Sequence, residues 1–254
     1  MSRIVVKVGS AVLTQDGTIA LNRMQALVDF LAELKQNNEV ILVSSGAVAG
    51  GYTKIKLDRA ILANKQALAA IGQPVLMGEY ARKFKKYDII TAQVLVTAVN
   101  LRHEDDIQRI RNTVDTLISN GVIPIVNEND ATATDELEVG DNDQLSAYIT
   151  KHTGSNMLII LSDIDAYYDS DPRQHKNAKV LKVVKEIQTA ELDKEVTPNN
   201  IFATGGIVTK LKAASYLLNS NIDMYLASGF DLNDVKEFAL HNTHNGGTLF
   251  TKGQ

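Results

Sequence analysis

The sequence predicts an α/β fold in which helices cover both faces of a mainly parallel β-sheet, giving a three-layer αβα sandwich. Three observations support this prediction. Short runs rich in β-branched residues recur along the chain, and amphipathic segments whose apolar residues follow three- and four-residue spacing lie between them. The two patterns alternate, as they do when each strand is followed by a helix that packs back on the sheet.

Six runs have the composition of parallel strands that are buried on both faces. In chain order they are residues 4–8, 40–43, 89–96, 122–126, 157–161 and 222–227. Residues 21–34 and 107–118 each place apolar side chains on one helical face, so we expect helices there. The least regular segment, residues 165–200, is expected to form a surface loop or hairpin.

The chain is long enough to bury a sizeable core, with 254 residues of which 44% are hydrophobic. We expect a single domain over residues 1–254. A boundary between two lobes, residues 1–154 and 155–254, is consistent with the composition near residues 154–156.

Composition excludes several classes of function. The formal net charge of -4 gives no basic field for nucleic acid, and the absence of cysteine excludes disulfides and thiolate chemistry. No apolar run approaches the roughly 20 residues needed to span a bilayer, and the N-terminal run is too short for a signal peptide. We therefore expect a cytoplasmic protein without nucleic-acid or membrane partners.

Glycine, hydroxyl and amide residues follow three of the predicted strands. The motifs are "KVGS" at residues 7–10, "SSGAVAGG" at 44–51 and "NEND" at 127–130. Ligands of open α/β sheets bind beyond the carboxyl ends of the strands, where free backbone N–H groups can meet an anion. Each motif alone is compatible with an ordinary turn into a helix, but their coincidence favours a ligand site.

Two lysines belong to this pattern. Lys7 interrupts an apolar strand, and Lys210 follows the glycine pair of "ATGGIVTK" by about one helical turn. The P-loop and dinucleotide-binding spacings are absent. Two lysines directed at one polyphosphate would offset charge during phosphoryl transfer. The alternatives are that Lys7 extends to solvent from the strand end and that Lys210 is an ordinary exposed helix residue.

The stretch "VGDNDQLSA", residues 139–147, places Asp141, Asn142 and Asp143 immediately before a predicted helix. A helix needs only one such residue as its N-terminal cap. The excess indicates that some of these side chains serve a ligand.

These residues resemble the glutamate 5-kinases, a family within the amino-acid kinase superfamily. The resemblance rests on "VVKVGS", "VSSGAVAGG", "PIVNENDATAT", "VGDNDQLSA", "DPR" and "TGGIVTK", and it extends from residue 4 to about residue 250. It implies the amino-acid kinase fold and ATP- and Mg²⁺-dependent phosphorylation of the side-chain carboxylate of L-glutamate, the first step of proline biosynthesis. A carboxylate is already ionised near neutral pH, so this reaction needs no general base.

The resemblance also implies residue roles. Lys7 and Lys210 would act on the transferring phosphoryl group, and Asp143 would hold the two lysines in place. Residues 1–154 would bind glutamate and residues 155–254 ATP. The implied glutamate contacts are Ser45, Asp130 and Asn142, and the implied ATP contacts are Lys7, Gly9, Ser162, Asp163, Thr204, Gly205, Gly206, Ile207, Val208, Thr209 and Lys210.

The sequence departs from the family pattern in the loop at residues 162–166. The sequence "LSDIDAYY" has Ser162 and Ala166 where relatives often carry threonine and glycine, and we expect no C-terminal PUA domain after "GTLFTKGQ". The family further implies a homodimer or homotetramer and feedback inhibition by proline. "DSDPR" lacks the spacing of a calcium loop, so we interpret it as a solvated loop and assign no metal ligands.

Two alternatives remain open on the sequence. One is a kinase of the same superfamily that phosphorylates acetylglutamate, aspartate or carbamate. The other is a non-catalytic sensor of amino acid and nucleotide, which would be expected to lack one of the lysines or Asp143.

Overall fold

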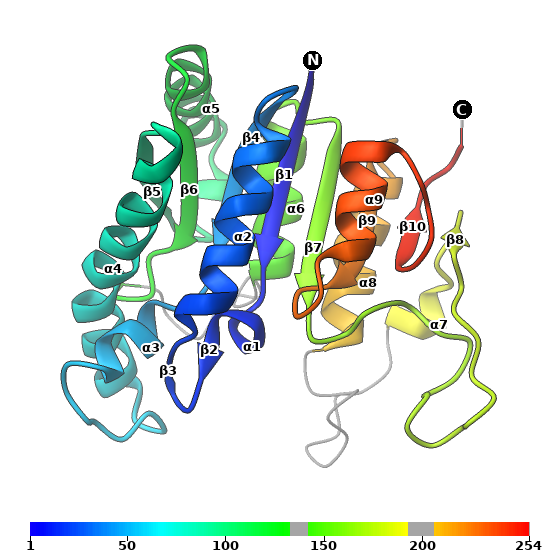
Figure 1. Ribbon diagram of the computed structural model, residues 1–254, viewed down its shortest axis with the longest axis horizontal. Coiled ribbons are helices and arrows are strands. Elements are labelled where there is room, and N and C mark those ends of the chain that lie inside the picture. Colours follow the sequence, from blue (N-terminus) through cyan, green and yellow to red (C-terminus); the bar gives the residue numbers. More distant parts are fainter. Residues whose placement is uncertain (133–141, 193–205, 254) are drawn as a thin grey trace.

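A computed structural model describes residues 1–132, 142–192 and 206–253. Its centre is an eight-stranded sheet with the order β5-β6-β4-β1-β7-β9-β10-β8, and helices lie on both sides of it (Figure 1). All strand pairs of this sheet are parallel within the described residues, except that β10 runs antiparallel to β9. The prediction of a three-layer sandwich with a mainly parallel sheet is confirmed.

The strands are β1 (Ser2–Val8), β2 (Thr14–Gln15), β3 (Thr18–Ile19), β4 (Asn38–Ser44), β5 (Thr91–Val96), β6 (Ile123–Glu128), β7 (Met157–Ser162), β8 (Val183–Val184), β9 (Asp223–Ser228) and β10 (Thr248–Phe250). The α-helices are α1 (Ser10–Leu13), α2 (Leu21–Leu34), α3 (Ala47–Tyr52), α4 (Leu62–Phe84), α5 (Glu104–Ser119), α6 (Asn142–His152), α7 (Thr189–Leu192), α8 (Ile207–Leu218) and α9 (Asn233–His241). Two short 3₁₀ helices are η1 (Lys85–Tyr87) and η2 (Asn100–Arg102).

Alternate residues of each central strand pack against different helical layers, as the two-residue period of a strand requires. In β1, Val6 faces a core shared with α2, α4 and α9, whereas Val5 faces a core shared with α5, α6 and α8. Both side chains are fully buried. Because the inner strands are covered on both faces, they are apolar over most of their length, which is why the sequence shows apolar runs rather than alternation.

Six strands match the predicted runs, and four short strands were not predicted. β2 and β3 form a small hairpin around Asp16 and Gly17, both with positive φ. An Asp-Gly pair is a common signal for such a turn. β8 and β10 add two strands at the sheet edge. In the segment from residue 165, a bridge between Tyr168 and Val180 agrees with the expected loop or hairpin.

Helices α3 and α4 cross at very short distance. A Cβ atom on Gly72 of α4 would overlap the carbonyl oxygen of Ala47 in α3, and a Cβ on Gly51 would overlap the carbonyl oxygen of Leu68. Glycine is therefore required on both sides of the crossing. The crossing fixes the start of α3, and with it Gly46 (φ 110°) and the end of β4.

The carboxyl ends of β1, β4, β6 and β7 meet at one edge of the sheet, at the end of the molecule opposite the N-terminus (Figure 1). The three motifs that follow predicted strands therefore lie together, as expected for parallel strands.

Candidate active site

A cavity of about 850 Å³ opens at this edge of the sheet. It is lined by ten of the residues that the sequence analysis assigned to the site. They are Lys7, Gly9, Ser45, Asp130, Asn142, Asp143, Ser162, Asp163, Gly206 and Lys210. Thr204 and Gly205 lie outside the described residues.

Asp143 lies at the base of the cavity between the two predicted lysines. Its Oδ1 accepts a hydrogen bond from Nζ of Lys7, and its Oδ2 accepts one from Nζ of Lys210 at 3.0 Å. The hydroxyl of Thr209 donates to the same Oδ2 at 2.9 Å. Asp143 is on the first turn of α6, Lys7 is on β1 and Lys210 is on α8, so three distant segments meet at one carboxylate.

All three charged side chains are buried, with 4% exposure for Lys7, 1% for Asp143 and 5% for Lys210. Burial by itself would raise the pKa of Asp143, but the two ammonium groups lower it to about 2, so the carboxylate stays ionised. The alternatives in which either lysine extends to solvent are excluded. Lys210 also donates to the carbonyl oxygen of Gly206 at 2.9 Å, which fixes its ammonium near the start of α8.

Asn142 precedes Asp143 and joins the ends of two strands. Its Nδ2 donates to Oγ of Ser45 at 2.8 Å, to Oδ1 of Asn127 at 3.3 Å and to the carbonyl oxygen of Ser44 at 3.4 Å. Ser45 follows β4 and Asn127 is in β6, so Asn142 connects two of the predicted motifs across the cavity.

Asp130 lines the cavity just beyond β6. Burial raises the pKa of its carboxyl group, and the positive charge of Lys65 opposes that shift. A partly buried carboxylate of this kind is suited to receive a cationic group from a ligand.

The other side of the cavity is formed by residues that the resemblance assigns to the nucleotide. The backbone N–H of Gly9 donates to the carbonyl oxygen of Leu161 at 3.0 Å, which joins the end of β1 to that of β7. The hydroxyl of Ser162 donates to Asp163 at 2.9 Å. The side chain of Val208 is buried, so only its backbone is available to a ligand, whereas Ile207 is partly buried against the core shared with α6 and α8.

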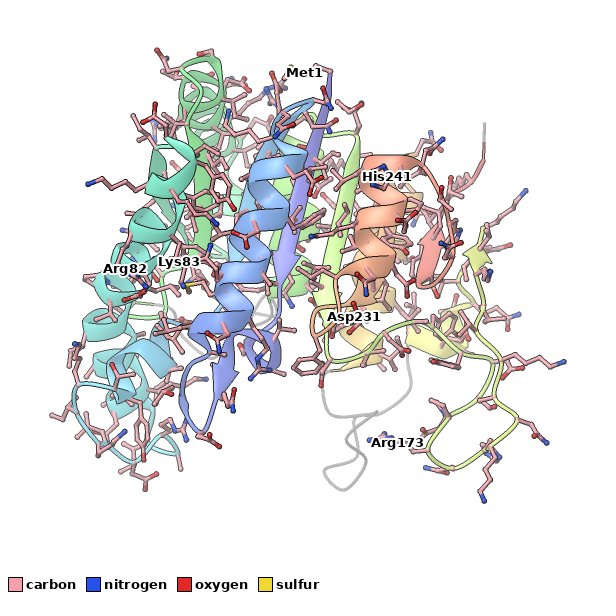
Figure 2. All side chains as sticks on the ribbon, viewed as in Figure 1. Met1, Arg82, Lys83, Arg173, Asp231 and His241 are labelled. Atoms are coloured by element: carbon pink, nitrogen blue, oxygen red, sulfur yellow. The ribbon has the colours of Figure 1, made fainter. Side chains whose placement is uncertain are left out.

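Three basic residues of the cavity were not among the predicted site residues. Arg59 and Lys65 belong to the chain before and within α4, and Arg173 belongs to "DSDPR". Figure 2 shows Arg173 at the end of the molecule opposite Met1. The expectation that "DSDPR" is only a solvated loop is therefore incomplete, because Pro172 and Arg173 line the cavity while Asp171 pairs with Arg173 at 3.3 Å.

Over the described parts of the chain, no three His, Cys, Asp or Glu residues are grouped so as to hold a metal ion on their own. The cavity lining does include the carboxylates of Asp163 and Asp165. A magnesium ion bound with a polyphosphate needs only one or two protein carboxylates, so this donor set fits such an ion.

A buried carboxylate that joins two lysines at a cavity of about 850 Å³, at the carboxyl ends of parallel strands, defines a site for phosphoryl-group chemistry. The family model described as "Amino acid kinase family" matches residues 2–228. The chain belongs to the amino acid kinase family.

Individual relatives show which members of the family this chain is similar to. The chain is 51% identical to a protein named glutamate 5-kinase from Leishmania donovani, over 98% of this chain and 95% of the relative. It is 50% identical to a glutamate 5-kinase from Wolinella succinogenes, over 100% of this chain and 99% of the relative. A crystal structure of an isopentenyl phosphate kinase from T. acidophilum superposes with a TM-score of 0.68 at 15% identity, covering 98% of this chain and all of the other, which supports the fold alone.

Proposed function

We propose that this protein is an ATP-dependent glutamate 5-kinase, which phosphorylates the side-chain carboxylate of L-glutamate to L-glutamyl 5-phosphate in the first step of proline biosynthesis. The observation that carries the proposal is the carboxylate of Asp143 held between Lys7 and Lys210 at the base of the cavity. The relatives named glutamate 5-kinase at about half identity over nearly the whole chain support the choice of substrate.

The chemistry requires two anions to be brought together. One oxygen of the glutamate side-chain carboxylate forms a bond to the γ-phosphorus of ATP, the bond from that phosphorus to the β–γ bridging oxygen breaks, and ADP leaves with the electron pair. Lys7 and Lys210 offset the charge on the transferring group, and Asp143 fixes their positions. No side chain has to remove a proton from the nucleophile.

Mg²⁺ would supply further charge neutralisation on the ATP phosphates. Asp163 and Asp165 are the residues we propose to hold it, directly or through water, because both line the cavity just beyond the end of β7.

The two parts of the chain divide the substrates in this proposal. Residues 1–154 bind glutamate through Ser45, Asp130 and Asn142. Residues 155–254 bind ATP through Ser162, Asp163 and residues 204–210, together with Lys7 and Gly9 from the first strand. The start of α8 supports this division, because the backbone N–H groups of a helix N-terminus favour phosphate.

Three further properties are proposals on the basis of the family. We propose a cytoplasmic enzyme that forms a homodimer or homotetramer and is inhibited by proline. None of the described helices combines the length and apolarity needed to cross a bilayer. Size-exclusion chromatography with light scattering tests assembly, and titration of activity with proline tests the inhibition.

The experiment for the main proposal is an assay of purified protein with glutamate, ATP, Mg²⁺ and hydroxylamine. We expect glutamyl hydroxamate and ADP in equal amounts. A panel of acetylglutamate, aspartate and carbamate, compared by kcat/KM, should place glutamate first. Lys210→Met should abolish turnover because the transferring group loses one of its two cations. Background ADP formation with every acceptor would contradict the proposal and favour a non-catalytic sensor.

A further inference from the structure

Four primary amides form a hydrogen-bonded chain from the cavity to the edge strand of the sheet. Nδ2 of Asn142 donates to Oδ1 of Asn127 at 3.3 Å, and Nδ2 of Asn127 donates to Oε1 of Gln73 at 3.0 Å. Nε2 of Gln73 then donates to Oε1 of Gln93 at 3.0 Å. All three bonds run in the same direction, and Asn127 and Gln73 are 2% and 7% exposed.

The backbone fixes the orientation of the second amide. The N–H of Glu128 donates to Oδ1 of Asn127 at 2.9 Å, so this oxygen has to face the backbone of β6. The NH₂ group of Asn127 consequently faces Gln73, and Gln73 has to present its oxygen. Reversing the Asn127 amide would bring its NH₂ group against a backbone donor.

The orientation of Asn142 follows from its surroundings. Its NH₂ group is occupied by Ser45, Asn127 and the carbonyl oxygen of Ser44. Rotating the amide by half a turn would direct its oxygen at two carbonyl oxygens. The remaining atom, Oδ1, is buried and has no hydrogen-bond partner among the described residues.

A buried acceptor without a donor is unfavourable, and a ligand that brings a donor removes that cost. At neutral pH both carboxylates of glutamate are acceptors only, and its α-ammonium group is the donor. From the residue types alone, an amide donor such as Asn142 suits a carboxylate of glutamate, and Asp130 suits its ammonium group. The hydrogen bonds favour the ammonium group over a carboxylate.

We propose that Gln73 is a positioning residue for recognition of the substrate α-ammonium group. The backbone N–H of Glu128 holds the oxygen of the Asn127 amide and Gln73 holds its NH₂ group, so the two together fix the amide that accepts from Asn142. Asn142 then offers its oxygen to the ammonium group beside Asp130. This inference rests on the proposed function. Gln73 does not line the main cavity but a smaller one of about 180 Å³ that shares Asp130 with it, and its hydrogen-bonded link to Asn142 runs through Asn127.

The test compares glutamate with glutarate, the same dicarboxylate without the ammonium group. For Gln73→Met we expect the KM for glutamate to rise about tenfold, the loss that one hydrogen bond can account for. The inhibition constant of glutarate and the KM for ATP should stay within about twofold, because neither ligand uses the ammonium site. Gln108→Met on the exposed face of α5 is the matched control and should change none of these constants.

Gln73→Glu keeps an oxygen that accepts from the NH₂ group of Asn127. The side chain of Gln93 is exposed, so its amide can turn and donate to the other oxygen of the new carboxylate. The KM for glutamate should therefore stay within about threefold of the wild type. If Gln73→Met does not fold by circular dichroism, this variant decides, and a tenfold rise in its KM would overturn the inference. An equal rise in the glutamate KM and the glutarate constant for Gln73→Met would overturn it as well. Failure of the wild type to bind or phosphorylate glutamate would instead refute the proposed function, and this inference with it.

Discussion

Asp143 links the electrostatics of the site to the stability of the fold. Lys7 and Lys210 would be two like charges in the protein interior without it, and removing one partner of a buried ion pair is more costly than removing the whole pair. We expect Asp143→Asn to lower the free energy of unfolding at pH 7 by at least about 2 kcal/mol and to lower kcat strongly. Chemical denaturation and the hydroxamate assay measure the two effects.

The matched control is Asp105→Asn on the exposed first turn of α5, because the Asp105 carboxylate is in none of the ion pairs found among the described residues. Its effect should stay below about 1 kcal/mol, the range of a helix-dipole interaction at the surface. Equal losses of stability in the two variants would contradict the importance given to the buried pair.

The pKa of Asp143 also predicts how stability depends on pH. The folded pKa, about 2, is below the ordinary value of 3.8, so the unfolded state binds more protons between these values. The stabilisation is complete above about pH 4 and is lost as the pH falls toward 2, with a total near 2 kcal/mol. Denaturant titrations of wild type and Asp143→Asn should therefore converge over this interval. If the difference in unfolding free energy between the two proteins stayed constant from pH 5 to about 2, the lowered pKa of Asp143 would be contradicted.

The residue types of the site were predictable, but their contacts were only partly so. Lys7 and Lys210 stood out because each interrupts or follows an apolar or glycine-rich motif. Thr209 was assigned to ATP, and its bond to Asp143 depends on the direction of a side chain on α8, which spacing does not fix. Arg59 and Arg173 lie in irregular segments, where nothing in the local pattern distinguishes a cavity lysine or arginine from a solvated one.

At the level of the elements, the α3–α4 crossing positions the glutamate side of the cavity. Gly72→Ala should force these helices apart, since the new methyl group meets the backbone of α3. We expect a loss of about 1–3 kcal/mol in stability and a higher KM for glutamate, because α3 begins two residues after Ser45. Thermal unfolding and steady-state kinetics provide the measurements.

Gly78 is the matched control in the same helix. A Cβ atom there meets nothing within 4 Å, so Gly78→Ala should be neutral or stabilise the protein by up to about 1 kcal/mol through helix propensity. If Gly72→Ala behaved like Gly78→Ala, the close crossing would not be what determines the position of α3.

Long elements were predicted better than short ones. The strand from Ile4 and the helix from Leu21 carry enough periodic residues to be recognised, whereas β8 contains two residues and β10 three. Strands this short depend on their neighbours for pairing, and their own residues carry little signal. The Asp16–Gly17 turn did have a signal, and the β2–β3 hairpin could have been predicted from it.

For the whole molecule, the sheet is continuous across the proposed boundary between the two parts of the chain. β1 pairs with β4 on one side over seven residue pairs, and with β7 on the other side over five, from Ile4 to Val8. We therefore expect one cooperative unfolding transition by calorimetry, with equal calorimetric and van't Hoff enthalpies. Two separate transitions would show that residues 1–154 and 155–254 are independent folding units.

The strand order also has a consequence for synthesis on the ribosome. The first strand to emerge, β1, is an inner strand whose second neighbour, β7, is made more than a hundred residues later. Until then the nascent chain exposes an apolar, unpaired strand edge, which is a template for association with other chains. Production of this protein should accordingly depend on chaperones or slow translation more than its final compactness suggests, and fragments that end before Met157 should aggregate.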